Sequence, residues 1–166
     1  MSTEQKNASA AQTEYPQLLL ENQLCFPFYA CARKIVNLYT PYLKPLGITY
    51  TQYIVFMVLW EKQEVSVREL CTRLFLDSGT LTPMLKKMEK DGYVTRRRSA
   101  EDERVTLIRI TDAGMALREQ AAEIPFKVGG CLKLPAEEAD CLYKIMYQLL
   151  EEFQRKTEKR LSSRPV

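Results

Sequence analysis

The chain has 166 residues, enough for one domain with a hydrophobic core, and its formal net charge of +3 is too small to indicate a partner by itself. It has no histidine, the usual general base, so we expect neither an enzyme nor a hydrolytic site. The five cysteines form no C-x-x-C pair, so we expect no metal, no cofactor and no disulfide framework. No secretion signal or membrane-spanning run is apparent, which favours a cytoplasmic protein without membrane contact.

The predicted elements begin with a polar arm, residues 1–17, which lacks periodicity and which we expect to be disordered. Residues 22–44 keep the apolar spacing of a helix, and the Pro-Leu-Gly sequence at 45–47 should end it. Capping-box patterns at residues 49–52 and 66–69 predict the start of two further helices.

Residues 77–92 predict a helix with one buried face and one polar face. Apolar side chains recur at helical spacing, at Leu81, Met84, Leu85 and Met88. The opposite face carries donors that suit phosphate oxygens and base edges, namely Ser78, Thr80, Thr82, Lys86 and Lys87. The small residues on this face allow a close approach, so we interpret it as a DNA-contacting surface.

A basic β-hairpin with an acidic turn follows directly. Arg96, Arg97 and Arg98 precede the turn, and Arg104 follows it. We expect Arg96 and Arg104 to contact DNA, with Arg104 in or beside the minor groove. Asp102 should orient Arg104, because phosphate repels a carboxylate. The alternative is an ordinary surface helix beside a hairpin whose arginines protect a sheet edge.

Two more helical patterns complete the chain. Thr111 and Asp112 should cap a helix that extends to Ile124, and Pro125 should bend its end. A final helix should begin near Pro135. Its wide apolar stripe consists of Leu142, Ile145, Met146, Leu149, Leu150 and Phe153.

The order of these elements predicts a mainly α fold with a small β-hairpin wing. Residues 49–110 would form a winged helix-turn-helix. Residues 18–48 and 111–162 would form a helical dimerisation region, all within one compact chain. A homodimer would present two recognition helices to two half-sites, which matches a pseudo-palindromic operator in double-stranded DNA.

Cys25 has a sequence context that suits a reactive thiol. It follows Asn22, a good N-cap, so it should lie in the first turn of a helix, where the helix dipole favours a thiolate. Pro27 fits this placement, because a missing N–H is tolerated near a helix start. Cys131 follows two glycines and should lie on mobile backbone. The alternative for any cysteine is a small buried apolar residue, and we interpret Cys31, Cys71 and Cys141 in that way.

Several stretches resemble one family. Asp102-Glu-Arg-Val105 and Thr111-Asp-Ala-Gly114 resemble the wing signature of the MarR family of winged-helix repressors. Three longer stretches, LENQLCF at 20–26, LGITYTQY at 46–53 and LDSGTLTPMLKKME at 76–89, are similar to its branch of organic hydroperoxide resistance regulators. The resemblance covers about residues 18–155, which is nearly everything except the arm.

The resemblance implies a transcriptional repressor that holds its operator when reduced and is induced by an organic hydroperoxide. Cys25 would be the sensing cysteine, and the hydroxyls of Tyr39 and Tyr50 would bind its thiolate from the partner subunit. In the two-cysteine type of this branch, Cys131 would then form an intersubunit disulfide with Cys25. The chain departs from the branch at Pro27, where an aliphatic residue is usual, which bears on the geometry of the first turn.

Three alternatives remain open at the level of the sequence. One is a regulator of the same fold that binds a small ligand and does not sense oxidants. Another is a thiol peroxidase, which would turn over many equivalents of peroxide. A third is a DNA-binding protein that has no response to oxidants.

Overall fold

The structure is a computed structural model that describes residues 15–131 and 133–162, with side chains through Lys156. The helices are η1 (Pro16–Leu18), η2 (Leu20–Asn22), α1 (Cys25–Leu43), η3 (Lys44–Leu46), α2 (Tyr50–Lys62), α3 (Val67–Leu74), α4 (Ser78–Lys90), α5 (Asp112–Ala121), α6 (Ile124–Gly129) and α7 (Ala136–Ser162). The strands are β1 (Glu64–Ser66), β2 (Val94–Arg98) and β3 (Thr106–Ile110).

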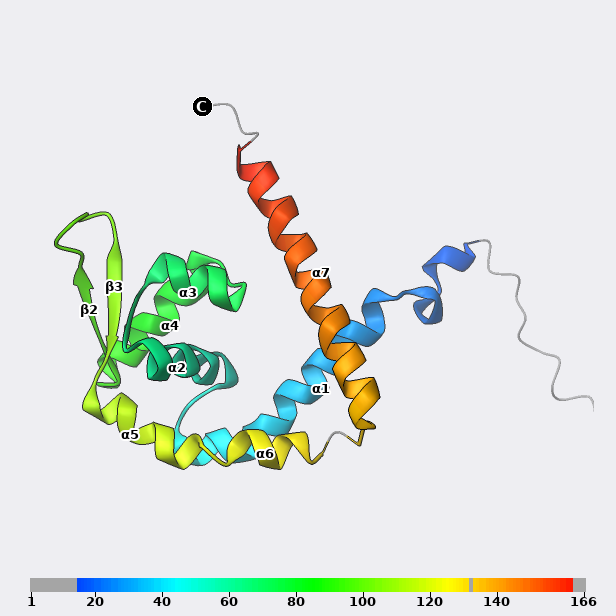
Figure 1. The fold of residues 1–166 in the computed structure, drawn as a ribbon, viewed down its shortest axis with the longest axis horizontal. Coiled ribbons are helices and arrows are strands. Elements are labelled where there is room, and N and C mark those ends of the chain that lie inside the picture. The colour runs from blue at the N-terminus through cyan, green and yellow to red at the C-terminus, as the bar shows by residue number, and fades with distance from the viewer. Residues whose placement is uncertain (1–14, 132, 163–166) are drawn as a thin grey trace, which may run out of the picture. The chain divides into compact units, whose positions relative to one another are not determined.

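Contacts divide the chain into two compact units, one ending at Pro125 and the other beginning at Phe126. The first unit contains α1 to α5 and all three strands (Figure 1), so the predicted winged helix-turn-helix lies entirely within it. The second unit contains most of α6 and all of α7. None of the described helices is long and apolar enough to cross a membrane.

The predicted mainly α fold with a small β-hairpin is confirmed. Strands β2 and β3 pair antiparallel from Val94↔Ile110 to Arg98↔Thr106. The sequence analysis missed β1, a strand of three residues that pairs with the other edge of β3 and completes the sheet order β1-β3-β2. Three residues are too few to show the alternation by which a strand is recognised in a sequence.

The core of the first unit joins α2, α3, α4 and the sheet. Its most deeply buried apolar residues include Val55, Phe56, Leu59, Leu70, Leu81, Leu85, Met88, Val94 and Ile108. At the base of the hairpin, α5 packs closely against this core, because the Trp60 indole N–H donates to the Gly114 carbonyl at 3.0 Å. The base of the hairpin is therefore attached directly to the core.

Helix ends follow the predicted caps in part. Thr49 and Gln52 form a reciprocal capping box at the start of α2, as predicted. Ser66 caps α3 by accepting from the Glu69 N–H, but the Glu69 carboxylate pairs with Arg73 at 3.1 Å, and no reciprocal bond to Ser66 is present. Left-handed Gly47 (φ 69°) ends η3 as predicted.

Other predictions near helix ends are wrong. Asn22 does not cap α1: it lies in η2, its side chain donates to the Pro16 carbonyl, and the N-cap residue is Leu24, whose side chain makes no capping bond. The helix capped by Thr111 ends at Ala121, and Ile124 begins the separate helix α6. The positions of these helix ends depend on local turns, which the spacing of apolar residues along the sequence does not indicate.

The predicted disordered arm falls largely on residues 1–14, which lie outside the described residues. Its last part is different from the prediction, because Pro16–Leu18 forms the 3₁₀ helix η1. Leu18 at the end of η1 and Leu20 at the start of η2 are exposed.

Candidate functional site

Helix α4 presents a polar face because its apolar face is anchored in the core. Leu81, Leu85 and Met88 are at most 1% exposed, as the predicted stripe required, while Met84 is partly exposed. Ser78, Thr80, Lys86 and Lys87 are exposed and Thr82 is half-buried. Sequence and structure therefore agree on which side of α4 is available to a ligand.

Asp77 fixes the start of α4. Its carboxylate accepts from the Thr80 N–H at 2.8 Å and from the Thr80 hydroxyl at 2.7 Å. These bonds from Thr80 lower the pKa of Asp77. The Thr80 hydroxyl donates its proton to this cap, so a phosphate oxygen would compete with Asp77 for it.

The hairpin tip presents Arg104 to solvent and holds it by one carboxylate. The Arg104 Nε donates to Asp102 Oδ1 at 3.1 Å, and the Arg104 N–H donates to the same oxygen at 3.0 Å. The side chain of Arg104 is nevertheless 91% exposed, which leaves most of its donors accessible. These bonds lower the pKa of Asp102, so its charge persists at neutral pH. The geometry fits the predicted orienting role of Asp102.

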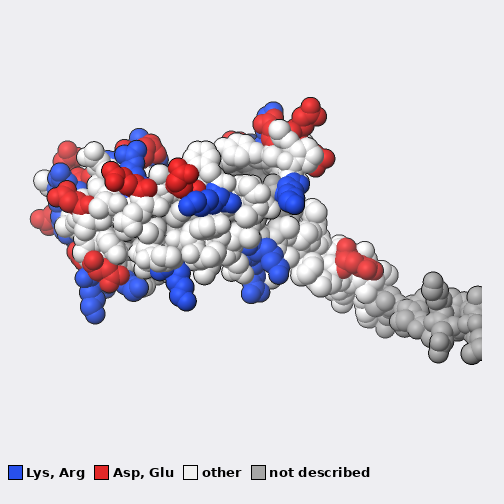
Figure 2. All heavy atoms as spheres, turned by 90° about the horizontal axis from the view of Figure 1, so that it is seen from below, with Lys and Arg blue, Asp and Glu red and all other residues white. Residues whose placement is uncertain are grey.

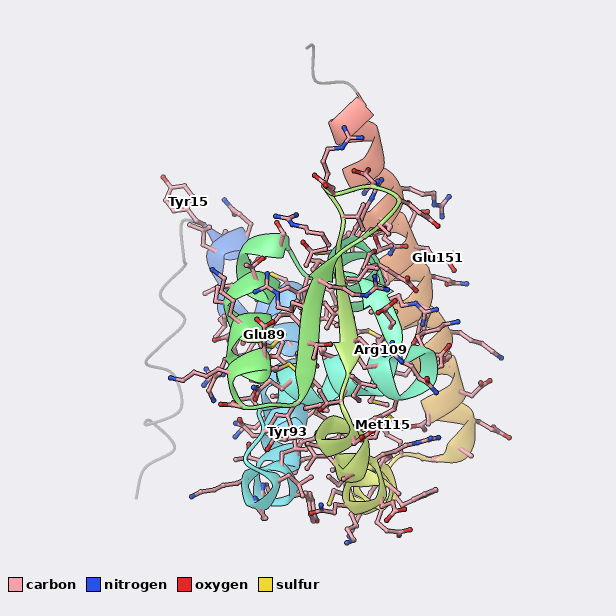
Figure 3. All side chains as sticks on the ribbon, turned by 90° about the vertical axis from the view of Figure 1, so that its left-hand side faces the viewer. Tyr15, Glu89, Tyr93, Arg109, Met115 and Glu151 are labelled. Carbon is pink, nitrogen blue, oxygen red and sulfur yellow. The ribbon has the colours of Figure 1, made fainter. Side chains whose placement is uncertain are left out.

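The other hairpin arginines have partners on α4, on β1 or within the hairpin itself. Arg96 is only 23% exposed and pairs with Glu89 of α4 at 3.6 Å. Arg97 pairs with Glu64 of β1, and Arg98 donates to the Thr106 hydroxyl at 3.2 Å. Figure 3 looks onto the hairpin and shows Glu89 on the neighbouring helix and Arg109 on strand β3. Sequence reasoning missed Glu64, because its role depends on the unpredicted strand β1.

These side chains border a shallow depression beside the hairpin. It measures about 280 Å³ and is lined by Glu89, Arg96, Arg97, Arg98 and Thr106. Figure 2 draws another face, on which basic and acidic side chains are interspersed over largely uncharged surface. The arginines are thus grouped locally at the hairpin, which agrees with the small net charge of the whole chain.

Cys25 is the first residue of α1 and is exposed. It therefore lies in the first turn, as predicted, although without the predicted Asn22 cap. Pro27 falls at the third position of the helix, where it disrupts no internal bond. The neighbouring apolar side chains Leu24, Phe26 and Phe28 are exposed as well. The thiol is therefore accessible from solvent, and its neighbours in the sequence expose apolar surface.

Tyr39 and Tyr50 lie together, with a third tyrosine beside them. The ring centroids of Tyr39 and Tyr50 are 4.9 Å apart, and those of Tyr39 and Tyr53 are 5.8 Å apart. Burial, and then the neighbouring Tyr39, raise the pKa of Tyr50, so its hydroxyl keeps its proton and can donate a hydrogen bond.

Within one chain these tyrosines cannot reach Cys25. Tyr39 follows Cys25 on the same continuous helix, and their positions imply a separation of about 21 Å at 1.5 Å per residue. A site that combines the thiol with these hydroxyls therefore requires a second copy of the chain.

The remaining cysteines differ in exposure. Cys131 is exposed and lies just after α6, where its Sγ is 3.4 Å from the Lys127 carbonyl oxygen. Cys71 is half-buried, and burial raises the pKa of its thiol. Cys31 and Cys141 are exposed, so their prediction as buried packing residues is wrong for the single chain. Among the described residues, no cluster of Cys, Asp and Glu is placed to hold a metal ion.

Known proteins match the chain over nearly its whole length. A family described as "Transcriptional regulator SarA/Rot" matches residues 37–120. The organic hydroperoxide resistance transcriptional regulator of Bacillus subtilis is 44% identical over 145 residues, which cover 87% of this chain and 99% of the relative. The chain belongs to the MarR family of winged-helix regulators, in the organic hydroperoxide resistance branch.

Solved structures agree with the placement of this MarR-family regulator. Reduced AbfR bound to DNA is 36% identical, with a TM-score of 0.68, and the match covers 85% of this chain and 99% of that one. The same relative, from Staphylococcus epidermidis, has also been solved overoxidized on DNA and in a disulfide-formed state, the latter with a TM-score of 0.59. A cysteine-to-serine mutant of MarR from E. coli, solved with operator DNA, is 26% identical, with a TM-score of 0.68 over 76% of this chain and 93% of that one.

Proposed function

We propose that this regulator is a dimeric, peroxide-sensing transcriptional repressor. In the reduced form, two copies would hold a pseudo-palindromic operator through Ser78, Thr80, Thr82, Lys86, Lys87, Arg96 and Arg104. Because an operator is part of the chromosome, the proposal places the protein in the cytoplasm.

One observation carries the redox part of the proposal. An exposed cysteine begins α1 in a chain whose relative AbfR has been solved both reduced on DNA and in a disulfide-formed state. The distance of about 21 Å along α1 between Cys25 and Tyr39 supports a sensor site shared by two subunits, since one chain cannot assemble it.

The proposed chemistry begins at Cys25. Its thiolate attacks the outer oxygen of an organic hydroperoxide, the O–O bond breaks, and the alcohol leaves as the sulfur becomes a sulfenic acid. The partner subunit's Cys131 then attacks that sulfur, an S–S bond forms and water leaves. Two thiols are thereby oxidised by two electrons, and the peroxide is reduced to alcohol and water.

We assign the release of DNA to the disulfide step. AbfR has been solved on DNA in its overoxidized state, so in that relative further oxidation is compatible with DNA binding. A disulfide, in contrast, holds its two sulfur atoms about 2.05 Å apart and so fixes one arrangement of segments from both subunits. A difference of a few kcal/mol between the two arrangements is enough to empty an operator.

A gel-shift series tests this proposal. The probe is a duplex that the reduced protein selects from a random-sequence library. We expect cumene hydroperoxide to release the probe and dithiothreitol to restore binding. Cys25→Ser should bind the probe and ignore the oxidant. Cys31→Ser is the matched control, because this exposed cysteine on the same helix should leave the response intact.

Other outcomes identify the alternatives. A Cys25→Ser variant that remains inducible would indicate a small-ligand regulator. Consumption of many equivalents of peroxide per chain would indicate a thiol peroxidase, whereas a sensor should consume about one. Release that dithiothreitol cannot reverse would contradict the disulfide step.

A further inference from the structure

The hairpin is attached to the body of the unit by a short strand. β1 pairs with β3 over three residues only, from Glu64↔Arg109 to Ser66↔Leu107. Beyond that point the two-stranded part of the hairpin is short: the pair Arg98↔Thr106 and the bond from the Ser99 N–H to the Val105 carbonyl lead to the loop that carries Arg104. An isolated two-stranded ribbon is marginally stable and strongly twisted. The direction of the tip therefore depends on what holds the ribbon where β1 ends.

One ion pair crosses the sheet diagonally beside this point, from Arg97, which lies opposite Leu107 where β1 ends, to Glu64, which begins β1. Arg97 of β2 donates to Glu64 of β1 through Nη2, at 2.7 Å from Oε1, and through Nε, at 3.1 Å from Oε2. Strand β3 lies between them, so the pair joins the two outer strands over the central one. A bidentate arginine–carboxylate pair fixes direction as well as distance, unlike most surface ion pairs.

A second cation supports Glu64. Arg109 lies opposite Glu64 in the register of β1 and β3, and Figure 3 shows it on β3. Bonding from Arg97 first, and then the charges of Arg97 and Arg109, hold the pKa of Glu64 below its usual range. Glu64 is therefore ionised at neutral pH and keeps hold of Arg97.

The ion pairs give Arg97 and Arg104 different surroundings. The fork of Arg97 is turned toward Glu64, whereas the Arg104 side chain is 91% exposed at the tip. Half of the Arg97 side chain is exposed, but its fork is engaged by Glu64, so we assign its contribution to the geometry of the hairpin.

We propose that Glu64 is a positioning residue for the wing: by holding Arg97 across β3, it sets the direction in which the hairpin presents Arg104 to DNA. This inference rests on the proposed binding of an operator. It assigns Glu64 no contact with DNA.

Two substitutions separate positioning from simple charge effects. E64Q makes the protein more positive by one charge, and R97K leaves the charge unchanged but removes the planar fork. If charge alone mattered, E64Q would tighten DNA binding and R97K would have no effect. Positioning predicts that both variants bind the selected duplex more weakly, by roughly fivefold, the upper end for a surface ion pair. Binding to a random-sequence duplex should not fall in parallel.

A double-mutant cycle with Arg104 adds a readout that a purely structural role would not change. Arg104 and Glu64 make no contact with each other, so independent effects should add. If Glu64 acts by aiming Arg104, then E64Q should cause almost no further loss in an R104A background. The matched control is E61Q, which removes the same charge, breaks the exposed Arg73–Glu61 pair (3.3 Å) outside the dimerisation region, and should leave binding unchanged.

A measurement without DNA completes the test. The tip is closed by the bond from the Ser99 N–H to the Val105 carbonyl and by that from the Val105 N–H to the Asp102 carbonyl, both 2.9 Å. Hydrogen exchange at Ser99 and Val105 should accelerate in E64Q while global stability stays near that of the wild type.

The inference is overturned if E64Q tightens binding to the selected duplex, or if its effect and that of R104A simply add. A wild-type protein that selects no duplex would instead contradict the proposed function. The two failures are therefore distinguishable.

Discussion

The surroundings of Gly114 leave no room for a larger side chain. A Cβ at this position would collide with the Tyr93 carbonyl oxygen and would lie 2.8 Å from Ile110 Cγ1. Its own carbonyl accepts from Trp60. The position joins α5 to the base of the hairpin, so any displacement here moves the wing.

Gly114→Ala should therefore destabilise the protein by about 1–3 kcal/mol, as overpacking does. Urea unfolding measures the change. Gly129→Ala is the matched control, because no described atom lies within 4 Å of a Cβ there, and its stability should stay at or slightly above that of the wild type. Equal effects of the two substitutions would show that the packing at Gly114 is looser than described.

Capping at the residue scale was predictable wherever the cap is local. Thr49 with Gln52, Asp77 and Thr111 all accept from an N–H three residues ahead, so a short sequence pattern contains the whole interaction. Asn22 failed because its side chain bonds backward to Pro16, through a turn that no capping pattern describes.

At the scale of elements, α7 carries an apolar stripe whose side chains are exposed. Ile145 is 46% exposed and Phe153 is 58% exposed. The other large apolar residues of the stripe are exposed as well, except for Leu150, which is half-buried. A contiguous exposed stripe of this kind is typical of an interface rather than of a solvated surface. The sequence had placed this helix in the predicted dimerisation region.

We expect Leu149→Asp to weaken dimerisation, since it would bury a charge in that interface. Sedimentation equilibrium should show a dimer dissociation constant at least about tenfold higher than in the wild type. Glu151→Ala, an exposed change on the same helix, is the control and should leave the constant unchanged. A Leu149→Asp variant that remains as dimeric as the control would place the interface elsewhere.

Strand β1 is an element that the sequence did not predict. Its three residues carry no period of their own, and they become a strand only because β3 offers a free edge. The partner of Arg97 was hidden with it. The hairpin itself was predictable, because its two strands and turn are contiguous in the sequence.

At the scale of the whole molecule, the proposed switch is a covalent link between two copies. Non-reducing electrophoresis after one equivalent of cumene hydroperoxide should convert the 19.3 kDa chain into a species of twice that mass. The conversion should be lost in Cys131→Ser and kept in Cys141→Ser, the control with another exposed cysteine.

A covalent dimer that persists in Cys131→Ser would assign the resolving role to another cysteine. Cys31 would then be the first to examine, because it is also exposed on α1. Loss of the covalent dimer together with intact release of DNA would separate oxidation of Cys25 from disulfide formation.

The amino-acid sequence was sufficient for the features that are local or periodic: the buried stripe of α4, the contiguous hairpin, the caps at Thr49 and Thr111, and the family. Folding in three dimensions was needed to show which charged groups meet, and hence that Arg97 is held by Glu64 while Arg104 stands free at the tip. It also brought Tyr39 of α1 beside Tyr50 and Tyr53 of α2. The physical reason is the same in each case: helical and strand periods act over a few residues, whereas these pairings join segments that only folding, or a second copy, brings together.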